Sequence, residues 1–265
     1  MAVISENTRL AIKAAIEAGK EILNIYQSGN FEIEIKCDTS PLTKADKAAH
    51  KIISSFLEKS QIPILSEEGK SISYEKRKNW DQLWIVDPID GTKEFIKRNG
   101  EFTVNIALIE NQTPIVGVIY APVLAELYFS EKGIGAFKAH LNLNKFDVSS
   151  PQSSALTLPI KSGPRPFTIV ASASHLSEAT NTYVDKMKTK YGNINLISRG
   201  SSLKLCMIAA GQADCYPRFG PTMEWDTAAG QAICDAAGFQ VVEWETKQKL
   251  KYNRKNLLNK WFIAH

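Results

Sequence analysis

The amino-acid sequence predicts a mixed α/β protein whose two parts differ in organisation. Residues 1–148 are expected to form an α+β part, because two helical segments share it with several strand-like runs. The segment 149–166 is rich in Ser and Pro, which favours a change of architecture there. Beyond it, strand-like and helix-like segments alternate, as is typical of an α/β layer. Residues 149–265 are therefore expected to form an α/β part.

Two helices are predicted in the N-terminal part. Residues 1–27 form an amphipathic pattern in which charged residues fall between apolar ones, and this pattern differs from that of a secretion signal. The second helix is expected from Thr43 to about Lys59. Asp46 stands three residues after Thr43, so the pair fits a capping box, and a purely structural role is one interpretation of Asp46.

Strand-like runs occupy most of the remaining N-terminal part. Asn111-Gln112 separates two long runs and predicts a hairpin turn, whereas the charged segment 70–81 predicts a flexible loop. The runs are 31–36, 62–65, 83–86, 102–110, 113–123, 126–130 and 135–138. In the C-terminal part we expect strands at 168–171, 194–198, 214–218 and 239–244, and helices at 177–190, 201–211 and 227–237.

The composition of the 265-residue chain argues against several classes of protein. The net charge of +4 suits a small anionic substrate, but without a concentrated basic run it does not favour nucleic acid. No segment approaches the length of a membrane span. The cysteines lack C-x-x-C spacing and predict reduced, mostly buried thiols in a cytoplasmic protein. They are Cys37, Cys206, Cys215 and Cys234.

The most informative stretch is residues 84–95, with the sequence WIVDPIDGTKEF. An apolar run ends there at Asp87, and Asp90 follows in a turn that Pro88 and Gly91 favour. Carboxylates held at a strand end can bind a divalent cation and present it to a phosphate. A plain surface turn is the alternative, since Asp-Pro and Asp-Gly pairs are common turn signals. The calcium-loop and D-x-D-G-T patterns both fail, because the second acid comes one residue late.

Two further acids stand at the ends of predicted elements. Glu67 follows the strand-like run 62–65, and Asp226 opens an Ala-rich helix, where a simple N-cap is the alternative. If they converge with Asp87 and Asp90, four carboxylates can hold two or more Mg²⁺ ions. Mg²⁺ prefers oxygen ligands in octahedral geometry, which such a group can supply.

A different kind of signal lies at the head of the helix predicted over residues 201–211. Unpaired backbone N–H groups, two hydroxyls and nearby positive charge predict an anion pocket, although an ordinary helix start is the alternative. Arg218 is a further candidate phosphate contact. The residues that offer the groups of the pocket are Arg199, Gly200, Ser201, Ser202 and Lys204.

These motifs resemble those of a known family. D-P-I-D-G-T at 87–92, S-E-E at 66–68 and E-W-D-T-A-A-G at 224–230 are similar to the Mg²⁺-dependent, lithium-sensitive phosphatases related to inositol monophosphatase. The resemblance runs at least from Asp38 to Gly238, and it implies a layered α-β-α-β-α sandwich with the metals between its two parts. Finer features resemble the bacterial 3′(2′),5′-bisphosphate nucleotidases, namely Lys93-Glu94-Phe95, Ser174-His175, Gly200-Ser201-Ser202-Leu203-Lys204 and Tyr216-Pro217-Arg218.

The resemblance also implies roles for individual residues. Thr92 and Asp46 would form a hydrogen-bonded pair that, with Glu67, orients and deprotonates the attacking water. The backbone amides of Gly91 and Thr92 would grip the scissile phosphate. The implied ligands of two or three Mg²⁺ ions are Glu67, Asp87, the carbonyl group of Ile89, Asp90 and Asp226. Substrate contacts are expected from Glu67, Ile89, Asp90, Gly91, Thr92, His175, Gly200, Ser201, Ser202, Lys204, Arg218 and Asp226.

The substrate that the resemblance favours is 3′-phosphoadenosine 5′-phosphate, a by-product of sulfate activation, which would be cleaved to AMP and phosphate. Inhibition by lithium is a further implication. The alternatives are an inositol or sugar phosphate phosphatase with the same metal core, and a nucleotide- or metal-sensing binding protein on the same scaffold. No nucleic-acid partner is expected. The resemblance leaves open the oligomeric state and a peripheral association with the cytoplasmic face of the inner membrane.

Overall fold

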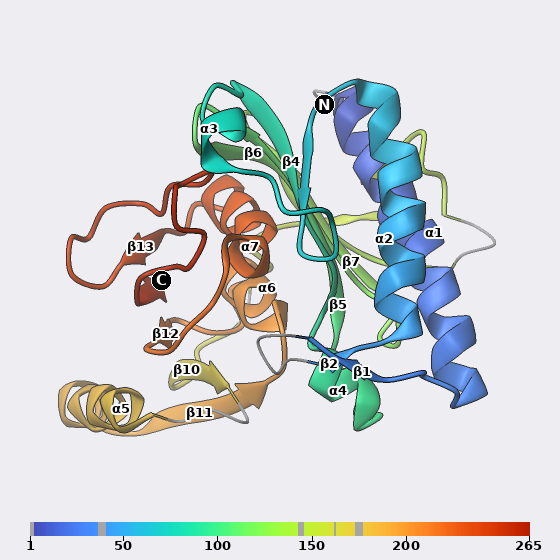
Figure 1. Ribbon diagram of the computed structural model, residues 1–265. Coiled ribbons are helices and arrows are strands. Elements are labelled where there is room, and N and C mark those ends of the chain that lie inside the picture. Colours follow the sequence, from blue (N-terminus) through green and yellow to red (C-terminus); the bar gives the residue numbers. More distant parts are fainter. Residues whose placement is uncertain (1–2, 37–40, 143–145, 162, 173–176) are drawn as a thin grey trace.

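The computed structural model describes residues 3–36, 41–142, 146–161, 163–172 and 177–265. A seven-stranded mixed sheet lies at its centre, in the order β3-β4-β5-β6-β7-β8-β9 (Figure 1). β3 and β4 are parallel, and all later neighbours are antiparallel. The strands are β3 (Ile64–Ser66), β4 (Gln82–Asp90), β5 (Thr103–Glu110), β6 (Thr113–Ala121), β7 (Glu126–Glu131), β8 (Gly135–His140) and β9 (Leu156–Thr157).

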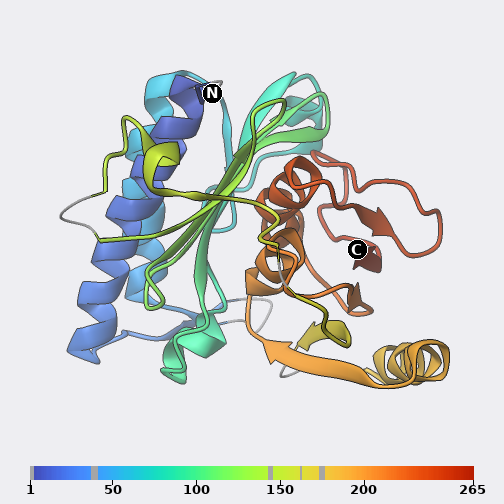
Figure 2. The ribbon, with the colours of Figure 1, turned by 180° about the vertical axis from the view of Figure 1, so that it is seen from behind.

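Helices α1 (Glu6–Ser28) and α2 (Lys44–Leu57) cover one face of this sheet (Figures 1 and 2). Both helices are amphipathic, and their apolar residues pack against alternate residues of the strands, such as Trp84 and Val86 of β4. Ile85, which lies between these two, points to the other face. Since both faces of the sheet are covered, β4 needs apolar residues on both sides, which explains its unbroken apolar run.

Helices α6 (Leu203–Ala209) and α7 (Glu224–Ala236) pack on the opposite face of the first sheet. The packing is close because glycines stand at the contacts. A Cβ atom on Gly117 of β6 would lie 2.4 Å from the carbonyl oxygen of Ala229 in α7, and one on Gly230 would lie 2.3 Å from a side-chain carbon of α6. These glycines therefore allow α7 to lie directly against the strands.

Two small sheets, joined by one isolated bridge, form the next layer. β10 and β11 are parallel, β14 pairs antiparallel with β12 and β13, and a bridge between Ile169 and Cys215 links β10 to β12. Helices α6 and α7 lie against one face, and α5 (Glu178–Tyr191) packs Val184 and Met187 against the other. The predicted α-β-α-β-α layering is therefore confirmed (Figure 1). The strands are β10 (Phe167–Ser172), β11 (Ile194–Arg199), β12 (Tyr216–Arg218), β13 (Val241–Glu243) and β14 (Phe262–Ala264).

Several connecting segments differ from their prediction. The strand expected over residues 31–36 is reduced to β1 (Glu34–Ile35), which pairs with β2 (Pro41–Leu42). The segment 70–81 is not a plain loop, because it contains the short helix α3 (Tyr74–Arg77). The strand β14 had no counterpart among the predicted elements.

The side chain of Arg77 explains why the segment 70–81 is not free of the core. Arg77 is 2 % exposed, and its Nη1 donates to Oδ1 of Asn253 at 2.8 Å. Asn253 donates back to the carbonyl oxygen of Arg77 at 2.7 Å. Because a buried guanidinium needs such partners, the pair ties this segment to the C-terminal region.

Other expectations concern turns, thiols and membranes. Asn111 and Gln112 both have positive φ, as the predicted hairpin turn requires. Cys206, Cys215 and Cys234 are buried and unpaired by disulfides, whereas Cys37 lies outside the described residues. In the part of the chain that the structure describes, no helix is long and apolar enough to cross a membrane. The expected localisation stays a prediction.

The proposed division of the chain at residue 148 also stays a prediction. Strand β9 pairs with β8 and so continues the first sheet to Thr157. Helices α6 and α7, which follow much later in the sequence, cover the same sheet. The residues of the candidate site come from both sides of the division.

Candidate active site

The carboxylates of Asp87 and Asp90 are brought to one side of β4 by a bulge. Asp87 pairs with Asn105 of β5 and Asp90 pairs with Thr103, so three steps along β4 match two along β5. In a regular strand, residues three apart point to opposite faces. The extra residue of a bulge cancels this alternation. The strand expected to stop at Val86 therefore continues through both acids.

Asp226 joins these two acids from the first turn of α7. Ligand oxygens of Asp87, Asp90 and Asp226 all lie within 4.8 Å of one another. Oδ2 of Asp226 accepts from the backbone N–H of Met223 at 2.8 Å. Asp226 is therefore not the N-cap, which is Met223, but its carboxylate bonds the N-cap backbone from the third position of α7 and still belongs to the cluster.

Glu67 lies at the edge of the same site. A cavity of about 440 Å³ is lined by Glu67 together with all three aspartates, and by Ile89, Gly91 and Thr92. Lys36 donates to Oε1 of Glu67 at 2.9 Å, and its ammonium group also bonds the carboxylate of Glu68. Although burial alone lowers the pKa of Lys36, these two acids raise it above its ordinary value.

Electrostatics make this group of acids suited to a cation. Burial raises the pKa of Asp87 well above its usual range, and the negative charges of Glu67, Asp90 and Asp226 raise it further. Burial and Asp90 raise the pKa of Asp226 in the same way. A bound divalent cation would offset the repulsion among these carboxylates and favour their charged forms. The aspartates offer only oxygen ligands, which Mg²⁺ prefers. The residues present therefore fit Mg²⁺ chemically.

Asp46 and Thr92 form the pair that the resemblance implies. Oγ1 of Thr92 donates to Oδ1 of Asp46 at 3.3 Å, and Oδ2 of Asp46 accepts from the backbone N–H of Thr43 at 2.7 Å. Burial raises the pKa of Asp46 to about 6, although the bonds from Thr43 oppose this shift. Thr92 is the first residue of the short helix α4 (Thr92–Ile96). Its Oγ1 also lies 3.3 Å from the carbonyl oxygen of Ile89.

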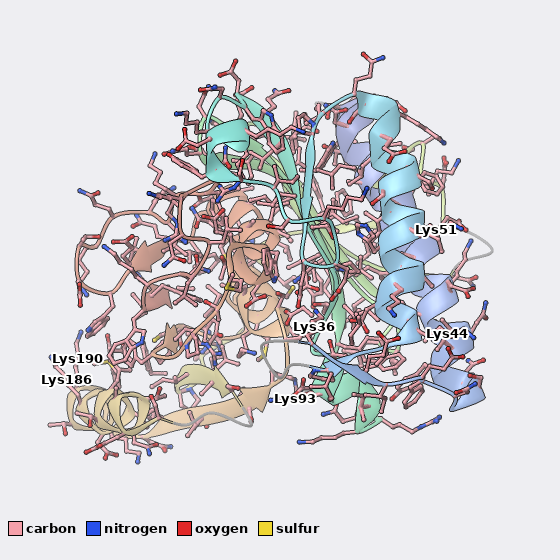
Figure 3. The ribbon with its side chains drawn as sticks, in the orientation of Figure 1. Lys36, Lys44, Lys51, Lys93, Lys186 and Lys190 are labelled. Carbon is pink, nitrogen blue, oxygen red and sulfur yellow. The ribbon has the colours of Figure 1, made fainter. Side chains whose placement is uncertain are left out.

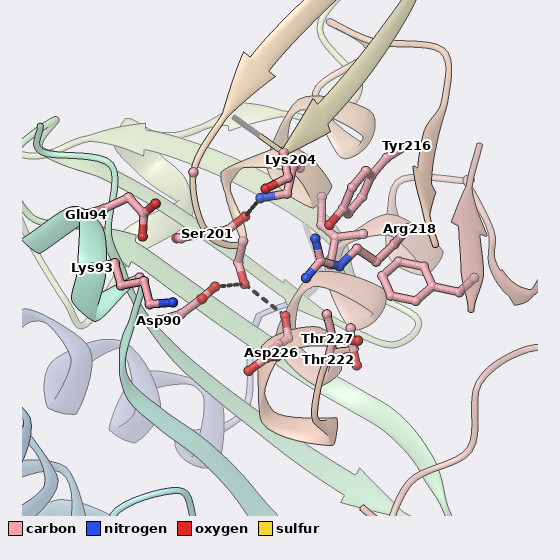
Figure 4. A pocket seen from close by; sticks show the side chains of 16 residues that line it. Asp90, Lys93, Glu94, Ser201, Lys204, Tyr216, Arg218, Thr222, Asp226 and Thr227 are labelled. Atoms are coloured by element: carbon pink, nitrogen blue, oxygen red, sulfur yellow. Dashed lines mark hydrogen bonds between the residues drawn. The ribbon is translucent and has the colours of Figure 1, made fainter. Parts of the chain in front are cut away.

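A second cavity of about 160 Å³ adjoins the first and shares Asp90, Gly91 and Asp226 with it. Figure 4 shows Ser201, Lys204, Tyr216 and Arg218 around it, with dashed lines from one serine hydroxyl to Asp90 and Asp226. That serine is Ser202, whose Oγ donates to Oδ2 of Asp90 at 2.7 Å. The two cavities are therefore neighbours, and between them they extend from the aspartates to Tyr216 and Arg218 of β12.

The wall at residues 199–204 differs in two respects from the predicted anion pocket. The N–H of Gly200 is not unpaired, because it donates to the carboxylate of Glu101 at 2.7 Å, and α6 begins only at Leu203. Lys204 is buried and donates to the carbonyl oxygen of Ser201 at 2.6 Å. Burial lowers the pKa of Lys204 to about 8.

Positive charge also borders the two cavities from other elements. Arg218 of β12 donates from Nη2 to the carbonyl oxygen of Pro221 at 2.9 Å, and its buried Nε has no partner among the described residues. Lys93 lines both cavities. In Figure 3, Lys36 and Lys93 lie toward the middle of the molecule, whereas Lys186 on α5 lies at its edge. His175, an expected substrate contact, lies outside the described residues.

Three polar residues of the site were not among those predicted from the sequence: Lys36, Thr103 and Asn105. Thr103 and Asn105 interrupt the otherwise apolar run 102–109 in a strand that is buried on both faces. A polar residue in such a run needs a partner, and this signal could have revealed them.

Comparisons with known proteins agree with this geometry. The model of the inositol monophosphatase family matches residues 4–263, so the chain belongs to the inositol monophosphatase family. A curated relative from Salmonella typhimurium, the 3′(2′),5′-bisphosphate nucleotidase CysQ, is 43% identical over 251 residues, which are 94% of this chain and 95% of the relative.

Solved structures show the same likeness. CysQ from Bacteroides thetaiotaomicron, described as a bacterial member of the inositol monophosphatase family, has a TM-score of 0.90 and 50% identity over 98% of this chain and 96% of its own. The extragenic suppressor protein suhB from Bartonella henselae has a TM-score of 0.74 and 27% identity, covering 98% of this chain and 93% of its own.

Proposed function

We propose that this protein is a 3′(2′),5′-bisphosphate nucleotidase that removes the 3′-phosphate of 3′-phosphoadenosine 5′-phosphate and releases AMP. The observation that carries this proposal is the pair of adjoining cavities, one lined by a cluster of acids and the other bordered by cationic side chains. Such a pair of cavities suits a substrate with a phosphate to be cleaved at one end and a second anionic group at the other. The nucleotidases among its relatives share most of its length.

The acids of the first cavity would hold two or three Mg²⁺ ions. Glu67, Asp87 and the Ile89 carbonyl would bind one ion, and Asp87, Asp90 and Asp226 a second. When bound, Mg²⁺ neutralises charge on the phosphate and lowers the pKa of coordinated water. The pairing of Lys36 with Glu67 supports this assignment, because a positive group already lies against one of the ligand carboxylates.

Thr92 and Asp46 would handle the proton of the attacking water. Thr92 lines the cavity and its hydroxyl donates to Asp46, so its oxygen would accept the water proton while Asp46 accepts the hydroxyl proton. Glu67 lines the same cavity and would orient the water. The backbone N–H groups of Gly91 and Thr92, at the start of α4, would bind the phosphate oxygens.

The second cavity would hold the nucleoside and its other phosphate. Arg218, Lys204 and Lys93 are cations of its wall, and the ring of Tyr216 lies beside Lys204. The unpartnered Nε of Arg218 supports an anionic ligand there, since a buried donor without an acceptor is costly. Contact with His175 stays a prediction. The physiological role would be the clearance of a by-product of sulfate activation.

A phosphate-release panel tests the proposal. Purified protein is assayed with 3′-phosphoadenosine 5′-phosphate, inositol 1-phosphate and a hexose phosphate, each with Mg²⁺ and with excess chelator. We expect kcat/KM to be highest for the bisphosphonucleotide and release to stop with chelator. A strong preference for the inositol ester would refute the nucleotidase assignment. Binding of the nucleotide without any release would indicate a sensor.

A further inference from the structure

The start of β5 contacts the wall of the second cavity in a regular way. Thr103 and Asn105 lie two residues apart in β5, so their side chains are on the same side of the strand, and Glu101 stands two residues before the strand begins. These three residues reach three consecutive residues that precede α6. The pairs are Glu101 with the N–H of Gly200 at 2.7 Å, Thr103 Oγ1 with Ser201 Oγ at 2.9 Å, and Asn105 Nδ2 with Ser202 Oγ at 2.8 Å.

The Thr103–Ser201 and Asn105–Ser202 pairs belong to one hydrogen-bonded network, which ends at the carboxylate of Asp90. Thr103 Oγ1 donates to Oδ1 of Asn105 at 2.9 Å, and Ser202 Oγ donates to Oδ2 of Asp90 at 2.7 Å. An ionised carboxylate only accepts, and an amide has separate donor and acceptor ends, so every bond has a fixed direction. The hydrogen-bonded network runs from Ser201 through Thr103, Asn105 and Ser202 to Asp90.

The three residues of this network that lie nearest Asp90 are buried. Thr103, Asn105 and Ser202 are at most 3 % exposed, so water does not compete for their hydrogen bonds. In such surroundings a satisfied network holds one geometry, and a missing link leaves an unpaired polar group. The amide of Asn105 is the central link, because it alone contacts Thr103, Ser202 and, at 3.4 Å, Oδ2 of Asp90.

We propose that Asn105 is a positioning residue that sets the Asp90 carboxylate and the Ser201–Ser202 wall in one geometry. Asn105 Nδ2 and Ser202 Oγ both donate to Oδ2 of Asp90, so neither bond occupies Oδ1. Groups that orient a ligand carboxylate in this way raise metal affinity. The catalytic meaning of this role rests on the proposed function, but its effect on cation binding does not.

Calorimetric titration with Mg²⁺ in the absence of substrate tests the role. Asn105→Ala should weaken Mg²⁺ binding by about tenfold, the lower end of the usual effect of such orienting groups. The matched control is Asn253→Ala, which removes an equally buried amide that bonds Arg77. The control should lower the melting temperature and leave Mg²⁺ affinity unchanged. Equal loss of affinity in both variants would mean a general structural effect and overturn the proposal.

Two further variants keep the test decisive if Asn105→Ala does not fold. Ser202→Ala removes the hydroxyl that bonds Asp90 and should also weaken Mg²⁺ binding; unchanged binding contradicts the proposal. Thr103→Val removes the donor to Oδ1 of Asn105, so it should raise the KM for the nucleotide and weaken Mg²⁺ binding less than Ser202→Ala does, because both bonds to Asp90 remain. If the unmodified protein binds Mg²⁺ but releases no phosphate from the bisphosphonucleotide, the proposed function fails while the binding test of Asn105 still stands.

Discussion

Thr92 Oγ1 lies 3.3 Å from one oxygen of Asp46, while the other oxygen of Asp46 accepts from the N–H of Thr43 and caps α2. A single carboxylate thus serves as a helix cap and as the partner of Thr92. The rigid N-terminus of α2 fixes the position of Asp46, and Asp46 in turn fixes the direction of the Thr92 hydroxyl.

Thr92→Val should lower kcat by about 100-fold or more, because it removes the hydroxyl that would relay the water proton and keeps the volume of the side chain. Steady-state phosphate release at saturating Mg²⁺ measures the effect. Thr92→Ser is the control and should retain most of the rate. Full activity in the valine variant would contradict the assigned role.

Asp90→Asn should lower the rate by orders of magnitude and leave the fold intact. The amide keeps the shape of the side chain and can still accept from Ser202, but it is a poor ligand for Mg²⁺. Circular dichroism checks the fold and phosphate release checks the rate. Unchanged turnover would exclude Asp90 as a metal ligand.

Removal of divalent cations should make stability fall as pH rises. Burial and neighbouring acids raise the pKa of Asp87, Asp226 and Glu67 in the folded protein, so without metal the folded state binds more protons than the unfolded state. The resulting stability is present below the ordinary carboxylate pKa and is lost as pH rises through the higher folded values. Thermal unfolding from pH 5 to 8 in chelator should show this decline, and Mg²⁺ should reverse it most strongly at high pH. A melting temperature that rises with pH in the presence of chelator would contradict the raised pKa values of these acids.

Arg218→Ala should reduce kcat/KM much more for 3′-phosphoadenosine 5′-phosphate than for adenosine 3′-phosphate. The two substrates differ only in the 5′-phosphate, so the ratio isolates the contact with that group. A charge-assisted contact of this kind contributes about 1.5–3 kcal/mol, which corresponds to a change of roughly 10- to 150-fold in the ratio. An equal loss for both substrates would place Arg218 elsewhere in the site.

Gly117→Ala should destabilise the fold by about 1–3 kcal/mol, as overpacking does in other cores. The added Cβ would meet the backbone of Ala229 at 2.4 Å, which α7 can relieve only by moving away from β6. Gly163→Ala is the control, since its Cβ would meet nothing within 4 Å. Chemical unfolding of the two variants compares them, and equal stability would show that α7 adjusts freely.

The acids of the site were predictable because their signals are local. Asp87 and Asp90 follow an apolar run and stand beside Pro and Gly, and Glu67 follows another run. Their meeting with Asp226 was expected from the family resemblance rather than from spacing, because it depends on the docking of α7 against the first sheet. The bulge in β4 could not be foreseen from an apolar pattern that ends at Val86.

Tertiary partners account for the features that the sequence analysis missed. Arg77 looked like part of a charged loop, and only its contact with distant Asn253 buries it. Asn105 stands in a typical strand run, and its importance comes from Ser202, which a different part of the chain supplies. The predicted free N–H of Gly200 was wrong for the same reason, since Glu101 approaches it from the other half of the protein.

The close packing of α7 on the first sheet has a mechanical consequence. Asp226 belongs to α7, whereas Asp87 and Asp90 belong to β4, so an ion bound by all three would link a helix to a strand. Release of that ion would weaken the contact between α7 and the first sheet. The force that holds this architecture together would then vary with the cation concentration around it.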